Sequence, residues 1–171
     1  MSIIQDHWRQ LVGNVHRADE TAFEAAPQHT FNLSFPPPAF TGNLDAPIVV
    51  LTSNGGYKAG KTEAEFPNDE AIAEYRAYLK SEVNRLPTHL SSYYSAGPFS
   101  KMIEDGSVVL VNAVPYRSPQ LSREPENRKV ALRLGSLAVH RKWLLEELLP
   151  QARSGNRFVF AHRNGWWGVP S

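Results

Sequence analysis

Three short apolar runs along the chain have the pattern of buried β-strands. They are residues 47–51, 107–111 and 157–161, and each is rich in Val, Ile, Leu or Phe. A continuous apolar run of this kind is typical of a strand whose two faces are both covered. The first two runs end at polar residues, 52–56 and Asn112. We therefore expect loops to begin at these positions.

Apolar residues recur with helical spacing in the segments around these runs. The spacing predicts a helix over residues 2–13. Asn68 has the side chain of a helix N-cap and begins a second helix. A short helix is expected over 97–103, and a longer helical region over 125–149 is interrupted by Gly135.

The alternation of strands with helices predicts the fold class. Helical connections of this length imply parallel strands joined by right-handed crossovers. We expect a three-layer α/β/α sandwich with a short parallel sheet, forming one domain over residues 1–171. Residues 1–39 form an N-terminal helix and loop appendage in this interpretation. A three-stranded sheet has an exposed edge, so dimerisation by edge pairing is a further expectation.

Composition narrows the chemistry of the 171-residue chain. It contains no cysteine, which excludes disulfides and thiolate metal sites. Its six histidines lack metal-ligand spacing, so neither a metal nor a cofactor is predicted. The start of the chain lacks the apolar centre of a signal peptide, and no run is long enough to span a membrane. We therefore expect a cytoplasmic protein without a membrane partner.

Charge is unevenly distributed along the chain. Residues 1–116 contain 8 Lys/Arg and 13 Asp/Glu, a net charge of −5, whereas residues 117–171 contain 10 and 4, a net charge of +6. The basic part either faces a polyanion or is a solvated helix surface.

Two asparagines follow the first two predicted strands. Asn54 and Asn112 are expected at the carboxyl ends of these strands, where open parallel sheets bind ligands. An asparagine offers both a donor and an acceptor, so such a pair can bind the edge of a planar heterocycle. Gly55 and Gly56 would let the backbone approach a ligand closely. Alternatively, both asparagines are turn residues.

Two segments resemble motifs of the uracil-DNA glycosylase superfamily. Residues 40–57 contain Phe-Thr-Gly-Asn and then Ala-Pro-Ile-Val-Val-Leu-Thr-Ser-Asn-Gly-Gly-Tyr, similar to the superfamily's first motif region. Residues 108–116, Val-Val-Leu-Val-Asn-Ala-Val-Pro-Tyr, resemble its second-strand element. The resemblance covers roughly residues 40–170. It implies a DNA partner, a pocket for a flipped base, and hydrolysis of an N-glycosidic bond in DNA repair.

The resemblance also implies roles for individual residues. Asn54 matches the residue that positions the attacking water, although an amide orients water and cannot deprotonate it. Asn112 matches the residue that hydrogen-bonds the base. Phe66 matches an aromatic that stacks on the flipped base, or else packs in the core. The other expected substrate-binding residues are Ser53, Gly55, Gly56 and Tyr57, and the expected phosphate contacts are Arg117 and Arg123.

The chain departs from the superfamily pattern at several places. Gly55 replaces the usual Pro and Thr52 the usual Gly, and the last motif, a His or Asn with Pro-Ser nearby, is not evident. In one interpretation, His162 substitutes for the missing catalytic histidine and Trp166 acts as the wedge that enters DNA. In the other, the segment after the third strand is a turn and His162 is structural.

Two other functions remain open. The chain is either a catalytically inactive or shortened relative that binds a nucleobase, a nucleotide or a protein, or an unrelated α/β hydrolase of a small nucleoside. Cleavage, binding without cleavage, and binding of free nucleosides alone would distinguish the three possibilities.

Overall fold

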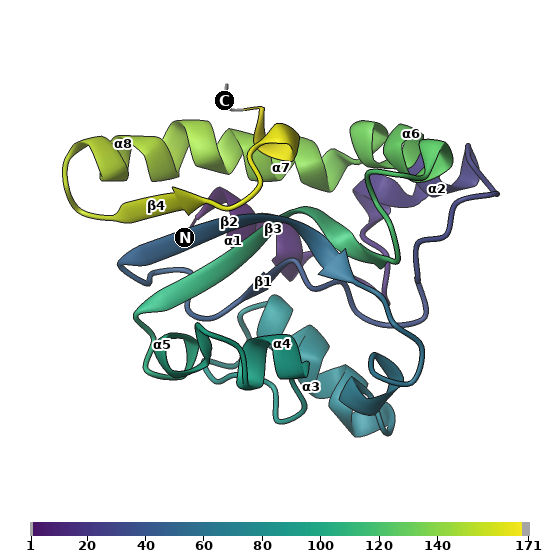
Figure 1. The fold of residues 1–171 in the computed structure, drawn as a ribbon, viewed down its shortest axis with the longest axis horizontal. Helices are drawn as coiled ribbons and strands as arrows, with labels where there is room; N and C mark the ends of the chain where they lie inside the picture. The colour runs from purple at the N-terminus through teal and green to yellow at the C-terminus, as the bar shows by residue number, and fades with distance from the viewer. Residues whose placement is uncertain (1, 169–171) are drawn as a thin grey trace.

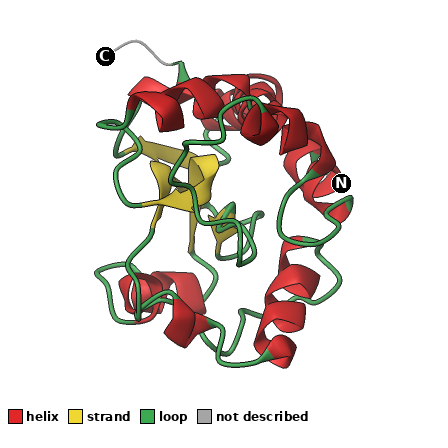
Figure 2. Cartoon of the chain, turned by 90° about the vertical axis from the view of Figure 1, so that its right-hand side faces the viewer, coloured by secondary structure: helices red, strands yellow, loops and turns green. Residues whose placement is uncertain are grey.

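The computed structural model describes residues 2–168 and has a β-sheet between two layers of helices (Figures 1 and 2). Helices α6, α7 and α8 lie on one side of the sheet, and α3, α4 and α5 lie on the other (Figure 1). The predicted three-layer α/β sandwich is therefore confirmed. In chain order the elements are α1 (Ile3–Arg9), α2 (Glu20–Glu24), β1 (Phe40–Thr41), β2 (Ile48–Gly56), α3 (Asp69–Leu79), α4 (Ser92–Ser95), α5 (Ser100–Glu104), β3 (Val108–Ser118), α6 (Pro125–Arg133), α7 (Gly135–Trp143), a π-helical turn (Leu144–Leu148), α8 (Leu149–Arg153) and β4 (Phe158–Ala161), with 3-10 turns at Arg17–Asp19, Glu63–Glu65 and Gly165–Trp167.

The sheet has four strands in the order β1-β3-β2-β4. Strand β2 is parallel to both β3 and β4, as the three apolar runs predict. The sheet is nevertheless mixed, because β1 pairs antiparallel with β3. Strand β1 has two residues, too few to show a period in the sequence.

Strands β2 and β3 extend further than their apolar runs. The prediction that they end at 52–56 and at Asn112 is wrong, since β2 continues to Gly56 and β3 to Ser118. Polar side chains do not interrupt a backbone ladder, and Thr52 pairs with Asn112 within it. The register shifts only after Asn54, in the stretch of β3 that holds Pro115, which has no N–H to donate.

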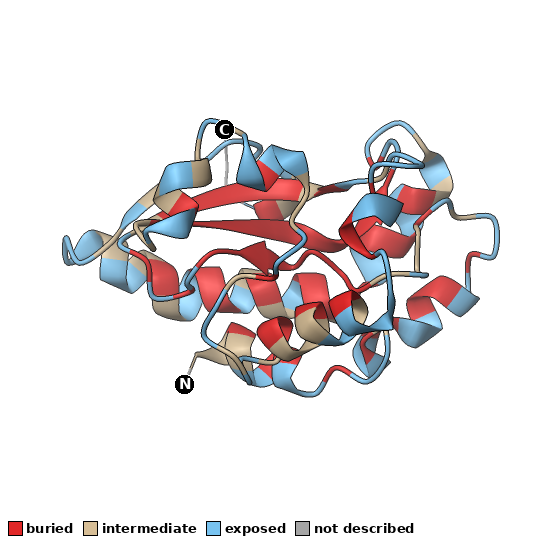
Figure 3. Ribbon diagram, turned by 90° about the horizontal axis from the view of Figure 1, so that it is seen from below, coloured by how far each residue is buried: buried red, intermediate tan, exposed pale blue. Residues whose placement is uncertain are grey.

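The N-terminal segment is part of the main core, not an appendage. Ile4 and Trp8 of α1 are fully buried in the same apolar cluster as the sheet. Helix α1 contacts both α7 and α3, so it joins the two helical layers. Figure 3 shows the buried sheet and the buried inner faces of the surrounding helices.

The helices begin largely where the sequence places them. The side chain of Asn68 accepts a hydrogen bond from the Ala71 N–H at 2.9 Å and caps α3. The predicted break beside Gly135 is also present: α6 ends at Arg133, Leu134 has an extended backbone with ψ of 126°, and α7 begins at Gly135. The short helix expected over 97–103 begins later, as α5.

Strand β4 forms one edge of the sheet. Among the described residues no strand pairs with its outer side, and its Phe158 and Phe160 are exposed. Dimerisation at this edge stays a prediction. Within residues 2–168, no helix has both the length and the apolar character needed to cross a membrane.

Candidate functional site: a polar pocket at the carboxyl edge of the sheet

A pocket of about 720 Å³ lies at the carboxyl ends of the parallel strands. This volume is within the range of roughly 300–1,000 Å³ that is usual for small-molecule sites. Residues from the ends of β2 and β3, from the loop after β4 and from α4 border it. The bordering residues are Thr52, Ser53, Asn54, Gly56, Tyr57, Lys58, Lys61, Thr62, Glu65, Ser91, Tyr93, Tyr94, Asn112, Arg117, Ser118, Pro119, Gln120, Leu121, Ser122, Arg123, His162 and Arg163.

The two predicted asparagines meet at this pocket. Asn112 of β3 pairs with Thr52 of β2, so their side chains point to the same face of the sheet. Asn54 is two residues further along β2 and therefore shares that face. Both asparagines border the pocket. They lie within strands, so the alternative that they are turn residues does not hold.

The amide of Asn112 is mostly engaged with the protein itself. Its Nδ2 donates to the Pro38 carbonyl at 2.6 Å, and its Oδ1 accepts from the Thr52 hydroxyl at 2.6 Å. The residue is buried. An amide has two donors and two acceptor lone pairs, and since the second N–H lies beside the Tyr94 hydroxyl, one acceptor lone pair remains for a ligand.

Asn54 has a less constrained oxygen. Its Nδ2 donates to the Gly55 carbonyl at 2.9 Å and to the Ser118 hydroxyl at 3.0 Å. Within residues 2–168, its Oδ1 accepts no hydrogen bond. An orientated amide oxygen at a half-buried position can hold a water molecule or a ligand N–H.

Glu65 and Arg117 form a buried ion pair at the pocket. Arg117 Nη2 lies 2.8 Å from Glu65 Oε2, and Nη1 lies 3.4 Å from Oε1. The two residues are 5% and 3% exposed. Burial raises the pKa of Glu65, while the charge of Arg117 opposes that shift. Arg117 was expected to contact phosphate, but in the structure its charge is directed at Glu65, a residue that the sequence placed only in an acidic loop expected to repel DNA.

Phe66 is packed in the core and does not border the pocket. Its ring stacks on Phe35 with centroids 4.8 Å apart and an interplanar angle of 10°. The guanidinium of Arg117 lies 5.7 Å from the centroid of the same ring. These contacts correspond to the core-packing alternative for Phe66.

Two tyrosines supply the aromatic wall of the pocket. Tyr94 is buried, and Tyr93 is 56% exposed, with the two rings edge-to-face at 5.1 Å. They come from α4, a helix of four residues with no detectable period. The adjacent pair of tyrosines was the only sequence signal, and from the sequence we expected packing in preference to a place in the pocket wall.

Four exposed cations surround the mouth of the pocket: Lys58, Lys61, Arg123 and Arg163. None of them forms an ion pair with another described residue. They come from the loops after β2, β3 and β4, so three chain segments contribute positive charge to one opening. Arg123, one of the two expected phosphate contacts, thus lies at the mouth of the pocket.

The remaining predicted residues have different positions. Ser53, Gly56 and Tyr57 border the pocket, and the Tyr57 hydroxyl donates to Glu63 at 3.0 Å. Gly55 does not border it, because this glycine packs against Pro38.

His162 lies at the rim of the pocket and is exposed. Its backbone N–H donates to the Leu51 carbonyl at 2.9 Å. Trp166 is half-buried against the main core and does not border the pocket, while the indole of Trp167 donates to the Thr52 carbonyl at 2.8 Å. The tail thus holds β2 in place, and the wedge role of Trp166 gains no support from this packing.

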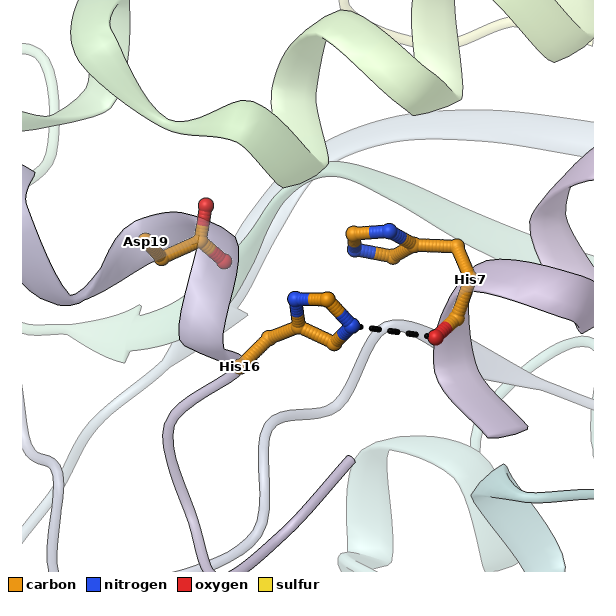
Figure 4. A group of neighbouring side chains, drawn as sticks. All are labelled: His7, His16 and Asp19. Atoms are coloured by element: carbon orange, nitrogen blue, oxygen red, sulfur yellow. Dashed lines mark hydrogen bonds between the residues drawn. The ribbon is translucent and has the colours of Figure 1, made fainter. Parts of the chain in front are cut away.

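His7, His16 and Asp19 form a separate, buried polar cluster (Figure 4). No spacing in the sequence predicts that these residues lie together. The imidazoles of His7 and His16 stack with centroids 3.7 Å apart, so their in-plane lone pairs do not converge on one point. Both nitrogens of His16 are engaged, Nε2 with the His7 carbonyl and Nδ1 with the Ala18 N–H. This arrangement is that of a hydrogen-bonded network linking α1 to α7, not of a metal centre.

The fold and the pocket together define an α/β sandwich with a polar, cation-rimmed pocket at the carboxyl edge of its parallel strands. Comparison with protein-family models, curated proteins and solved structures gives no match. The superfamily resemblance therefore remains an expectation from the sequence.

Proposed function

We propose that this pocket binds a nucleobase extruded from nucleic acid, as the resemblance to uracil-DNA glycosylases implies. The observation that carries the proposal is the convergence of Asn54 and Asn112 on one polar pocket with four exposed cations around its mouth. The amides supply acceptors for a base edge, and the cations supply the charge for flanking phosphates.

Hydrolysis of the N-glycosidic bond is the reaction proposed for this site. In that reaction Asn54 Oδ1 orients the attacking water, and Asn112 binds the base with its remaining acceptor. Arg123, Arg163 and the two lysines contact the phosphates. Tyr93 takes the stacking position that the resemblance assigns to Phe66, because its exposed ring is at the pocket.

Binding without cleavage is the second candidate function. It is favoured by the absence of an uncompensated carboxylate among the described residues that border the pocket. Asn54 is an amide, and the carboxylate of Glu65 faces Arg117. A general base needs a titratable group in reach of the water, and an amide does not supply one.

Short fluorescent oligonucleotides with a single uracil, in single- and double-stranded form, test both functions. We expect binding by fluorescence anisotropy, and a steep loss of affinity with added salt, because Lys and Arg contacts release counterions from phosphate. Strand cleavage after alkali treatment would show that the base is excised.

Asn54→Ala should abolish any cleavage, whereas Asn84→Ala, an exposed asparagine away from this pocket, should not. Binding without cleavage supports the second function. Binding of free nucleosides but not of oligonucleotides would support a nucleoside hydrolase. Absence of all binding would contradict the proposal.

A further inference from the structure

Strand β4 carries exposed aromatic rings on the face of the sheet that holds the pocket. Phe158 and Phe160 are 63% and 59% exposed, and they pair across the ladder with Ile48 and Val50 of β2. Paired residues of neighbouring strands point to the same face of a sheet. The two rings therefore share a face with Thr52, which borders the pocket two residues beyond Val50.

Helices α4 and α5 cover the middle of this face and leave its β4 edge open. Tyr94 of α4 and Ile103 of α5 pack with residues of β2 and β3 in one apolar cluster. Within residues 2–168, neither phenylalanine of β4 belongs to this cluster or to the main core. The side chains of both phenylalanines are therefore placed to contact a partner.

The exposed rings form a track that leads to the pocket. His162, two residues beyond Phe160, is also exposed and borders the pocket. Its backbone N–H donates to the Leu51 carbonyl, which continues the β-ladder to this residue. Alternate residues of a parallel strand lie about 6.6 Å apart on one face. The rings of Phe158, Phe160 and His162 therefore follow one another from the edge of the sheet to the rim of the pocket.

The charge of this part of the chain suits a polyanion. Residues 151–168 contain Arg153, Arg157 and Arg163 and no acidic residue. Arg163 is one of the four exposed cations at the mouth of the pocket. Antiparallel pairing of β4 with β4 of a second copy would bring the arginines that flank the strand close together, and facing like charges destabilise a sheet. A nucleic-acid strand fits these charges better than a second copy does.

We propose that Phe160 and Phe158 stack on the bases next to the one in the pocket, so that the protein selects single-stranded nucleic acid. In a duplex each base is already stacked and paired, whereas a single strand can turn successive bases onto successive rings. Exposed aromatic side chains beside a positively charged groove are typical of proteins that bind single strands. This inference rests on the proposed function, since it assigns the form of the nucleic acid that enters the same pocket.

The first test compares oligonucleotides of one sequence with a central uracil, in single- and double-stranded form, bound to the full chain. Fluorescence anisotropy at one fixed salt concentration measures the affinities. We expect the single strand to bind at least about tenfold more tightly, the effect of one base stacked on an aromatic ring. Abasic nucleotides on both sides of the uracil should lose this gain, because they remove the neighbouring bases and keep the phosphates.

The variant Phe160→Thr removes the ring and keeps a residue that favours β-strands. It should weaken single-strand binding about tenfold, and abasic neighbours of the uracil should then cost little more. The dependence of its affinity on salt should not change, because no contact to phosphate is lost.

Two control variants separate stacking from a general loss of apolar surface. Phe160→Tyr keeps an aromatic ring and should bind single strands as the wild type does. Leu145→Ala shortens a side chain that is 62% exposed, in the π-helical turn and outside the pocket, and should also keep the affinity.

The outcomes separate the two proposals. If no oligonucleotide binds, both this inference and the proposed function are wrong. Equal affinities for single and double strands, or an unchanged affinity in Phe160→Thr, overturn this inference alone. A wild-type dimer that this variant makes monomeric would assign the ring to a contact between copies and would overturn the inference too. Equal affinities of the wild-type chain for natural and abasic neighbours overturn it even if the variant does not fold.

Discussion

Gly55 shows how closely the backbone is packed beneath the pocket. A Cβ at this position would lie 2.3 Å from Cγ of Pro38. The carbonyl of Pro38 is in turn the acceptor that holds Asn112 Nδ2 at 2.6 Å. The sequence suggested that Gly55 lets a ligand approach, whereas the structure shows that it lets Pro38 approach.

Gly55→Ala should therefore destabilise the fold by about 1–3 kcal/mol, the usual cost of overpacking. Gly56→Ala is the matched control, because a Cβ there has no neighbour within 4 Å. Its effect should be within about 0.5 kcal/mol. Urea unfolding measures both, and equal midpoints for the two variants would contradict this account of Gly55.

The place of a site residue was predictable from the sequence only where a polar side chain directly follows an apolar strand run. Asn54 and Asn112 follow apolar runs, so topology alone brings them to one edge. Glu65 ends a three-residue 3-10 turn and Tyr93 lies in the four-residue helix α4, and both elements are too short to show a periodic pattern. The position of Glu65 depends on a tertiary contact, its pairing with Arg117 of β3.

At the scale of elements, α1 is held to the sheet by a chain of buried hydrogen bonds. The indole Nε1 of Trp8 donates to His140 Nε2 at 2.8 Å. His140 Nδ1 therefore carries the proton and donates to the Asn112 carbonyl at 2.7 Å. Helix α1 is thereby connected through α7 to the strand that borders the pocket.

Trp8→Phe should cost about 2–4 kcal/mol, because it leaves His140 Nε2 without a donor and creates a cavity. Trp166→Phe is the control. The Trp166 side chain is half-buried and makes no hydrogen bond within residues 2–168. We expect a loss below about 1 kcal/mol for the control. Comparable losses of unfolding free energy in the two variants would show that the Trp8 bond is unimportant.

The apolar strands were predictable as elements, and their ends were not. A run of β-branched residues marks a buried strand whatever surrounds it. The ends of β2 and β3 depend on each other, since each polar residue past the apolar run stays extended by pairing across the ladder. The integration of α1 was missed for a related reason: the spacing of Ile4 and Trp8 marks an apolar face, but not what covers it.

At the scale of the whole molecule, two buried histidines couple stability to pH. Burial lowers the pKa of His140 to about 4, and the hydrogen bond to the Asn112 carbonyl acts on this pKa in the opposite direction. Burial, with the nearby His16 and His140, lowers the pKa of His7 to about 3. Both rings are neutral in the folded protein at pH 7, whereas the unfolded chain has ordinary histidines with a pKa near 6.5.

The free energy of unfolding should therefore fall as the pH drops below about 6.5, because the unfolded chain then binds protons that the folded chain does not. The slope should approach about 1.4 kcal/mol per pH unit for each histidine. Burial raises the pKa of Glu65. Protonation of this carboxyl therefore favours the folded chain as the pH falls, and opposes part of the effect of the histidines. Urea midpoints at a series of pH values measure the slope, and midpoints independent of pH between about 6.5 and 5 would contradict the assignment.

The central claim is that the polar pocket at the carboxyl edge of the sheet binds a nucleobase. The most direct test is an amide chemical-shift titration of the 19.1 kDa chain with a short single-stranded oligonucleotide. We predict shifts concentrated at residues 52–62, 91–94, 117–123 and 162–163, with little change at α8. Shifts centred elsewhere, or none at saturating oligonucleotide, would contradict the account.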